Sequence, residues 1–176
     1  RSSGLAEIAR PYMRRLWEET HETVHLFIYE NGKAFYLDKL DSPHPVGMRS
    51  RIGAPLSLYS TSGGRSILAA LSEPELESYL AKTTLERRTN ATVTDQGTLR
   101  KILDDVRRNG WAEENQENEE GIRCVGAAVR SLDGTPAGAV SITAPAYRLG
   151  DDRAKTLGDR VRTVAEGISR ELGFRR

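Results

Sequence analysis

Apolar residues recur at helical spacing in several segments of the chain, and they alternate with polar residues in most of the segments between. From Leu5 to Trp17 the apolar positions repeat at i, i+3, i+4 and i+7, which predicts an amphipathic helix that Pro11 kinks or restarts. Ser72, followed three residues later by Glu75, is typical of a capped helix start. Further helices are predicted to open at 61–64 and to cover 95–108 and 151–172.

Alternation predicts two β-hairpins. The first covers 24–40 and turns at Asn31 and Gly32, because both residues tolerate the positive φ angles of a type I′ turn. It is apolar on both faces, so the sheet should be covered on both sides over this stretch. Residues 48–52 and the residues from Trp111 onward predict further strands. Hairpins in place of βαβ units predict an antiparallel sheet with helices packed on it, which is an α+β fold.

The second hairpin joins 122–130 to 137–143 and carries the only cysteine of the chain. A two-residue turn at Asp133 and Gly134 sets a register in which three pairs share one face of the sheet. These pairs are Cys124 with Thr143, Gly126 with Ser141, and Ala128 with Ala139. The other face is apolar. A face of small residues, hydroxyls and a thiol suits a ligand pocket, and it suits equally a helix that packs close to the sheet.

Composition narrows the class of protein. The 176 residues favour one domain, and 26 basic against 25 acidic residues are too balanced for a nucleic-acid-binding surface. One cysteine excludes an internal disulfide, and no Cys/His spacing is that of a zinc site. There is no apolar run of about 18 residues and no signal peptide. We therefore expect a soluble, cytoplasmic domain without cofactor or membrane contact. The missing initiator Met and the immediate helical pattern suggest a piece of a longer protein.

The segment Thr61–Gly64 is a candidate anion site. A helix N-terminus presents free N–H groups and a partial positive charge, and glycines let a ligand approach the backbone. Many helices that bind nothing begin in the same way, and the spacing of a P-loop is absent. A helix-turn-helix over 62–82 is rejected, because its second helix opens with Glu75 and Glu77, which DNA phosphates would repel.

Cys124 favours a structural role over catalysis. A nucleophilic thiol needs an electropositive setting and a base, and His21, His25 and His44 lie far from it in the sequence. Thiols within strands usually act as small hydrophobes, so we expect Cys124 to wall a pocket. We expect the histidines at the surface or in the core. The acidic segment 113–120 is predicted to be mostly a solvated loop from which one glutamate can reach the pocket.

Five segments together resemble one known family. They are T-H-E-T-V-H-L at 20–26, R-I-G-A-P-L-S-L-Y-S-T-S-G-G-R-S-I-L-A at 51–69, R-R-N-G-W-A at 107–112, E-E-G-I-R-C-V-G-A-A-V at 119–129 and A-V-S-I-T-A-P at 139–145. Over nearly its whole length the chain resembles the C-terminal effector-binding domain of the IclR-type (isocitrate lyase regulator) bacterial transcription regulators. The G-I-R-C segment, at its distance from T-S-G-G-R-S-I-L-A, is specific to that family.

The resemblance implies a fold and a domain organisation. The fold is a curved antiparallel sheet with flanking helices, similar to GAF and PAS sensor domains, with a small organic or aromatic acid bound between sheet and helices. Residues 1–20 would form the end of a linker helix, and 21–176 would form the effector-binding domain. A winged helix-turn-helix domain that binds DNA is expected upstream and is missing from this chain. Members pair as dimers and tetramers, so we expect a homo-oligomer.

The resemblance also implies the pocket residues. They are the backbone at Ser62 and Gly63, Glu114 or its neighbour Asn115, the thiol of Cys124, the hydroxyls of Ser141 and Thr143, and an apolar lining of Met48, Leu56 and Ile122. Three of these depart from the family pattern: Ser62 where a glycine can stand, Thr143 where a serine can stand, and Glu114 in place of a shorter Asp. Candidates to neutralise an acid are Arg49, Arg51 and Arg148.

The leading hypothesis is a domain without catalysis, which senses a small organic or aromatic acid within a DNA-binding transcription regulator and helps it to oligomerise. The alternative is a GAF-like enzyme, a reductase or hydrolase, that uses Cys124 as its nucleophile. A third hypothesis is an assembly domain whose pocket is vestigial. A low thiol pKa would favour the enzyme, and ligand binding without turnover would favour the sensor.

Overall fold

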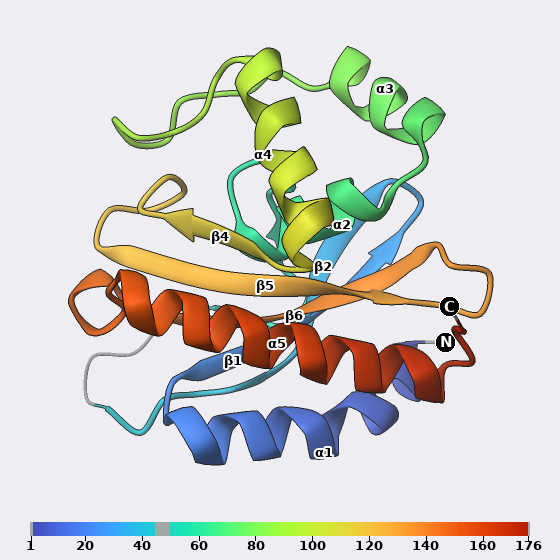
Figure 1. The fold of residues 1–176 in the computed structure, drawn as a ribbon, viewed down its shortest axis with the longest axis vertical. Coiled ribbons are helices and arrows are strands. Elements are labelled where there is room, and N and C mark those ends of the chain that lie inside the picture. The colour runs from blue at the N-terminus through green and yellow to red at the C-terminus, as the bar shows by residue number, and fades with distance from the viewer. Residues whose placement is uncertain (1, 45–49, 176) are drawn as a thin grey trace.

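The computed structural model describes residues 2–44 and 50–175, and within these ranges it consists of one curved antiparallel sheet between two layers of helices (Figure 1). The strand order is β3-β2-β1-β6-β5-β4. The strands are β1 (Thr23–Glu30), β2 (Lys33–Leu40), β3 (Pro55–Leu56), β4 (Ala112–Asn115), β5 (Ile122–Arg130) and β6 (Pro136–Pro145). The helices are α1 (Ser2–Thr20), α2 (Ser62–Ala70), α3 (Glu73–Lys82), α4 (Gln96–Asn109) and α5 (Asp151–Glu171), with a 3-10 turn at Ala146–Arg148. The predicted α+β class is confirmed.

Helices α1 and α5 lie side by side on one face of the sheet (Figure 1). Their predicted apolar stripes form the larger core with the inner face of β5 and β6. Members from the two helices are Leu5, Ala9, Met13, Leu16, Leu157, Val161, Val164 and Ile168. Helix α1 runs through Pro11 without the predicted restart, and Pro11 is exposed. None of the helices in the described ranges is long and apolar enough to cross a membrane.

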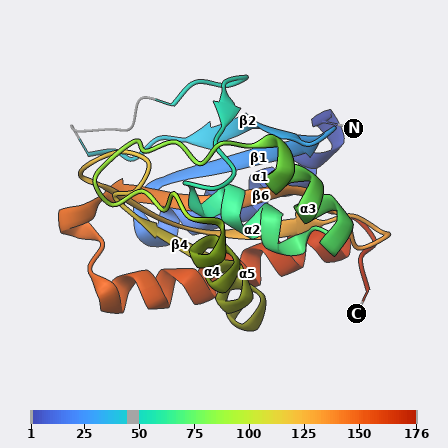
Figure 2. The ribbon, with the colours of Figure 1, turned by 90° about the horizontal axis from the view of Figure 1, so that it is seen from above.

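Helices α2, α3 and α4 cover the opposite face, as Figure 2 shows from above. Helix α2 packs directly on β5 and β6. Its two N-terminal glycines have a packing reason, because a Cβ on Gly63 would lie 2.6 Å from the Phe27 ring and one on Gly64 would lie 2.4 Å from the Cα of Leu58. The predicted capping box of Ser72 and Glu75 is present. Helix α2 opens where it was predicted to open, and Thr61 Oγ1 caps it by accepting from Gly64 N–H.

The first hairpin agrees with its prediction. Glu30 pairs with Lys33, and the two turn residues Asn31 and Gly32 have φ angles of 53° and 79°. Strand β1 lies between β2 and β6 at the centre of the sheet and is buried along most of its length. The two-sided apolar pattern therefore corresponds to helices on both faces.

The second hairpin has the predicted pairs but not the predicted turn. Cys124 pairs with Thr143, Gly126 with Ser141, and Ala128 with Ala139. The turn is a three-residue loop, 132–134, in which Ser131 N–H donates to the Thr135 carbonyl and Gly134 has φ +86°. A bulge next to it leaves Ala137 as an extra residue on β6 and restores the register. The longer loop and the bulge offset each other.

The strand predicted at 48–52 was wrong where it can be checked. Residues 48 and 49 lie outside the described ranges, and 50–52 are not in a strand. The chain reaches the edge of β2 only after Gly53, whose φ is +87°, and β3 follows at Pro55–Leu56. The turn at this glycine moves the pairing segment toward the C-terminus.

Candidate functional site

Most of the residues implied for the site meet where the N-terminus of α2 lies over β5 and β6. We call six of the side chains there the polar cluster: His25, Ser62, Glu114, Cys124, Ser141 and Thr143. All six are buried. Gly126 brings α2 close to the sheet, because a Cβ there would lie 2.9 Å from Gly63 N and 3.0 Å from Ser62 Oγ. The missing side chain at Gly126 thus lets α2 pack closely on the sheet, and polar side chains surround this point of contact.

The thiol of Cys124 is hydrogen-bonded to a carboxylate. Glu114 pairs with Cys124 across β4 and β5, and Cys124 Sγ donates to Glu114 Oε1 at 3.1 Å. Burial and then the charge of Glu114 raise the pKa of Cys124 well above its usual range. The thiol therefore stays protonated at neutral pH, because burial and Glu114 outweigh the Ser62 hydroxyl and N–H, which lower the pKa of Cys124.

Glu114 closes its own loop as well as accepting from the thiol. Its Oε2 accepts from the backbone N–H of Glu117 at 2.6 Å and of Asn118 at 3.2 Å. Burial raises the pKa of the Glu114 carboxyl in spite of these hydrogen bonds, which lower it. Strand alternation turns Glu114 inward and leaves Asn115 exposed, so the glutamate is the member of this pair that lies in the cluster.

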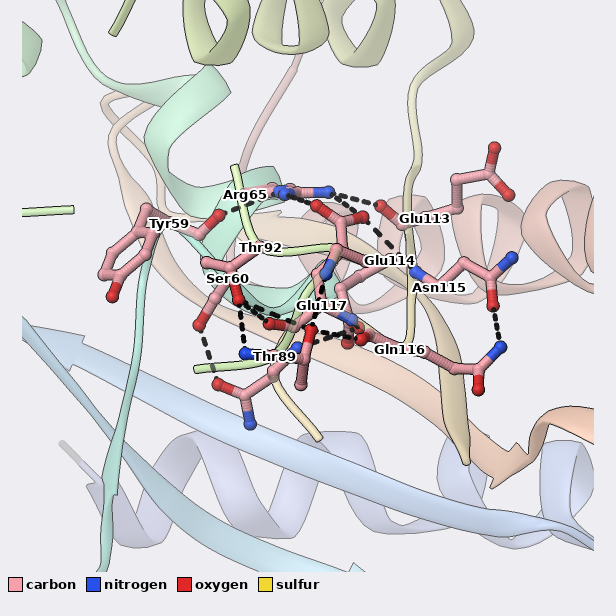
Figure 3. Close-up of polar contacts among 12 residues, drawn as sticks. Tyr59, Ser60, Arg65, Thr89, Thr92, Glu113, Glu114, Asn115, Gln116 and Glu117 are labelled. Atoms are coloured by element: carbon pink, nitrogen blue, oxygen red, sulfur yellow. Dashed lines mark hydrogen bonds and ion pairs between the residues drawn. The ribbon is translucent and has the colours of Figure 1, made fainter. Parts of the chain in front are cut away.

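Part of the segment 113–120 is not the solvated loop that its composition predicted. Arg65 from α2 is only 2% exposed, and its Nη1 and Nη2 donate to the two carboxylate oxygens of Glu117 at 3.0 and 2.5 Å (Figure 3). Arg65 Nε donates to the Tyr59 carbonyl, and Thr92 Oγ1 donates to the Glu117 carbonyl. A buried charge needs such partners, so Arg65 ties the loop to the start of α2.

The hydroxyls of the cluster are incompletely bonded. Ser62 is 1% exposed. Its side chain lies close enough to the Cys124 thiol to lower the pKa of that thiol, but its Oγ has the geometry of a hydrogen bond with none of the described residues. Thr143 Oγ1 lies 3.4 Å from His25 Nδ1, and Ser141 is buried beside it on the same face. A buried hydroxyl without a partner costs about 1–3 kcal/mol. Ser62 Oγ is therefore the atom at which a ligand or a water molecule is most expected.

His25 belongs to the cluster, although no pattern in the sequence placed it there. It is 2% exposed, its Nε2 lies 2.7 Å from Ser50 Oγ, and its ring packs against Phe27 and Tyr36. Burial, followed by the charge of Lys39, lowers the pKa of His25 to about 4. The ring is neutral at pH 7, so one nitrogen can donate and the other can accept.

The other residues expected at the site differ in where they lie and in how far they are buried. Leu56 is buried, and its Cδ2 would lie 3.5 Å from a Cβ on Gly63. Ile122 is half-buried on the face that carries Cys124. Met48 and Arg49 lie outside the described residues. Arg51 is exposed, and Arg148 is bonded to Glu22, so Arg148 does not serve the cluster. In the described ranges no group of three His, Cys, Asp or Glu side chains is arranged to hold a metal ion.

Two features define the class of this domain. A curved antiparallel sheet between helices, with a buried polar cluster under one helix N-terminus, is the architecture of GAF- and PAS-like sensor domains. The family model for the bacterial transcriptional regulator IclR C-terminal domain matches residues 1–170. The chain belongs to this family.

Named relatives agree with this assignment. The chain is 35% identical to the HTH-type transcriptional regulator KdgR of Escherichia coli over 162 residues. The aligned region covers 92% of this chain and 62% of KdgR. The IclR crystal structure from Thermotoga maritima superposes with a TM-score of 0.93 at 36% identity, over 97% of this chain and 69% of that one. An IclR homolog from Microbacterium hydrocarbonoxydans, complexed with 4-hydroxybenzoate, has a TM-score of 0.85 at 25% identity, over 97% and 69%.

The chain thus spans about 62% of the length of the curated relatives that it matches. Those relatives are named as transcriptional regulators or repressors. The raised pKa of the Cys124 thiol does not favour the alternative of an enzyme that uses this cysteine as its nucleophile.

Proposed function

We propose that the polar cluster binds a small organic or aromatic carboxylate and that the domain is the effector sensor of a transcription regulator. The observation that carries this proposal is Ser62 Oγ, a buried hydroxyl without a hydrogen-bond partner at the N-terminus of a helix. The 4-hydroxybenzoate complex of the Microbacterium homolog supports an acid as the ligand class. Met48, Leu56 and Ile122 would line the apolar part of the ligand.

The donors at the start of α2 suit a carboxylate. Thr61 caps the helix through Gly64 N–H, so the N–H groups of Ser62 and Gly63 are the ones that a ligand would reach. Ser141 and Thr143 would donate from the sheet, and Cys124 would wall the site. Micromolar binding corresponds to about 8 kcal/mol, which a few charge-assisted hydrogen bonds and modest apolar burial can supply.

Glu114 sets the pH dependence that we expect of this site. An ionised Glu114 would repel a bound carboxylate, and burial already raises its pKa. Binding should therefore strengthen as the pH falls and Glu114 takes up a proton. The effector would act on DNA only through a difference in its affinity for two arrangements of the full-length protein.

The proposal extends to the whole protein. Residues 1–20 would be the end of a linker helix and 21–176 the effector-binding domain, with DNA bound by a winged helix-turn-helix domain that precedes this chain. The protein would act in the cytoplasm as a dimer or tetramer. This chain spans 62% of the length of KdgR, which is consistent with a further domain in the whole protein.

The test is a calorimetric titration of the chain with 4-hydroxybenzoate, benzoate, glyoxylate and pyruvate. We expect one of these acids to bind saturably, and we expect the Ser141→Val/Thr143→Val variant to bind it at least about tenfold more weakly, because each lost hydrogen bond to a charged group is costly. The matched control is Ser78→Val/Thr163→Val, which changes one exposed serine and one exposed threonine elsewhere. Equal affinity in the Ser141→Val/Thr143→Val variant and the wild type would contradict the assignment.

A further inference from the structure

A separate cavity of about 370 Å³ lies at the other end of α2, where the C-terminal parts of α2, α4 and α5 meet β5. Strand β4 pairs with β5 only from Arg123 to Gly126, so the edge of β5 beyond Gly126 is open to this cavity. Its inner wall is apolar and small, with Ala69, Val106, Ala128 and Ala165 each from a different element.

The rim of the cavity is strongly basic. The lining includes the arginines Arg107, Arg130, Arg162, Arg170 and Arg175, and a single carboxylate, Glu166. Phe174 also lines it, and the Arg130 guanidinium lies 5.8 Å from the centre of that ring.

Two of these arginines have a structural role that accounts for them. Arg107 donates to the Ala69 carbonyl at the end of α2 and to Asp104. Arg162 pairs with Glu166, and its side chain lies against Gly110, where a Cβ would come within 2.5 Å of it.

No comparable structural role explains Arg170 and Arg175. Within the described residues, Arg175 donates to the carbonyls of Arg170 and Phe174 and enters no ion pair. Arg170 is exposed and, among the described residues, enters no ion pair. Both arginines line the cavity. A guanidinium is the group best matched to a carboxylate or phosphate group.

We infer that this cavity is a second small-molecule site, which binds an oxyanion on a compact apolar body. Arg170 and Arg175 would hold the carboxylate or phosphate group, while the alanine-lined wall and Phe174 would take the apolar part. The volume suits one ring with its anionic group, because a dry cavity of about 150 Å³ already holds benzene and ligand sites begin near 300 Å³.

The site is distinct from the polar cluster. Cys124 and Ala128 are four residues apart on β5, roughly 13 Å along the strand. Ser62 opens α2 at the polar cluster, and Ala70 closes it at this cavity, so the two sites lie at opposite ends of the same helix.

Calorimetric titration with phenyl phosphate tests the inference, with benzoate and inorganic phosphate as companion probes. Two variants address the cavity: Arg170→Ala/Arg175→Ala removes the charges, and Ala70→Phe fills the space. The charge control is Arg14→Ala/Arg15→Ala, on the exposed face of α1. Circular dichroism establishes that each variant is folded, and the Ser141→Val/Thr143→Val variant separates this site from the polar cluster.

We expect phenyl phosphate to bind once per chain and more tightly than inorganic phosphate. Either cavity variant should weaken it at least about tenfold, whereas the charge control and the Ser141→Val/Thr143→Val variant should bind as the wild type does. Phenyl phosphate and benzoate are compared in the Ser141→Val/Thr143→Val variant, where the polar cluster is disabled, and the stronger of the two identifies the oxyanion that the cavity prefers. The inference is overturned if neither phenyl phosphate nor benzoate binds the Ser141→Val/Thr143→Val variant at millimolar concentrations, if both cavity variants bind phenyl phosphate like the wild type, or if inorganic phosphate binds as tightly as phenyl phosphate.

Discussion

At the scale of single residues, burial sets the protonation of the groups in the polar cluster. Burial raises the pKa of Cys124, so its thiol is protonated at neutral pH. It lowers the pKa of His25, so its imidazole is neutral, and it raises the pKa of the Glu114 carboxyl. These groups are better suited to holding a ligand by hydrogen bonds than to attacking it. Two predictions follow from their positions.

The first prediction concerns the reactivity of Cys124. Iodoacetamide at pH 8 should alkylate the folded chain far more slowly than the urea-unfolded chain, because the thiol is buried and its pKa is raised. The Glu114→Gln variant should react faster than the wild type, since it removes the carboxylate that opposes the thiolate. Mass spectrometry of the single cysteine gives both rates. Equally fast alkylation of folded and unfolded wild type would contradict this account.

The second prediction concerns stability between pH 6.5 and 4. In the folded chain the pKa of His25 is about 4, against 6.5 for a free histidine. As the pH falls through 6.5, the unfolded chain binds a proton at this position and the folded chain does not, so stability falls until the pH reaches about 4. The loss from this residue amounts to roughly 3 kcal/mol.

Urea unfolding at several pH values measures this dependence. The His25→Gln variant should lose much of the fall in the free energy of unfolding over that interval. His44→Gln, at an exposed histidine, is the matched control and should keep the wild-type slope. If His25→Gln has the same slope as the wild type, His25 is not buried in its neutral form.

At the scale of elements, local pattern predicted what lies close in sequence. The capping box of Ser72 and Glu75 and the turn at Asn31 and Gly32 depend on residues within three positions of each other, and both are present. The pairs around Cys124 were predicted correctly although the turn was not, because the extra loop residue and the bulge at Ala137 offset each other. A single irregularity would have moved every side chain to the wrong face.

The acidic loop shows why some elements could not be predicted. Its residues look solvated because they are charged, but Glu117 is paired with Arg65, which is 52 positions away in the sequence. Only the folded chain brings that arginine into reach. The pair also makes a prediction at this scale.

Breaking the pair from one side should be costly. Arg65→Met leaves Glu117 without its partner in a site where its side chain is only 15% exposed, and we expect a loss of about 3 kcal/mol or more in the free energy of unfolding. The double variant Arg65→Met/Glu117→Met should recover much of that loss. Arg100→Met, which removes a half-buried arginine paired with the exposed Glu73 and Glu77, should cost less than about 1 kcal/mol.

Urea unfolding of the four chains gives the comparison. A loss for Arg65→Met no larger than that for Arg100→Met would show that the pair does not anchor the loop to α2.

At the scale of the whole molecule, the site is made by contacts that no local pattern reveals. His25 reaches Thr143 across 118 positions because β1 pairs with β6, and the sequence predicted the two hairpins without predicting how they join. The resemblance to the IclR-type domain supplied the placement of Ser62 over Cys124, which periodicity could not. The packing role of Gly63, which makes room for Phe27, likewise depends on that long-range pairing.

The central claim is that a small carboxylate binds at the N-terminus of α2, and an NMR titration of the ¹⁵N-labelled chain tests it most directly. We expect 4-hydroxybenzoate or another small acid to shift the amide signals of Ser62, Gly63, Cys124 and Thr143 saturably, and we expect the Ser141→Val/Thr143→Val variant to lose these shifts but not any shifts around Arg170. Saturable shifts confined to other regions, or none with any of the acids, would contradict the claim.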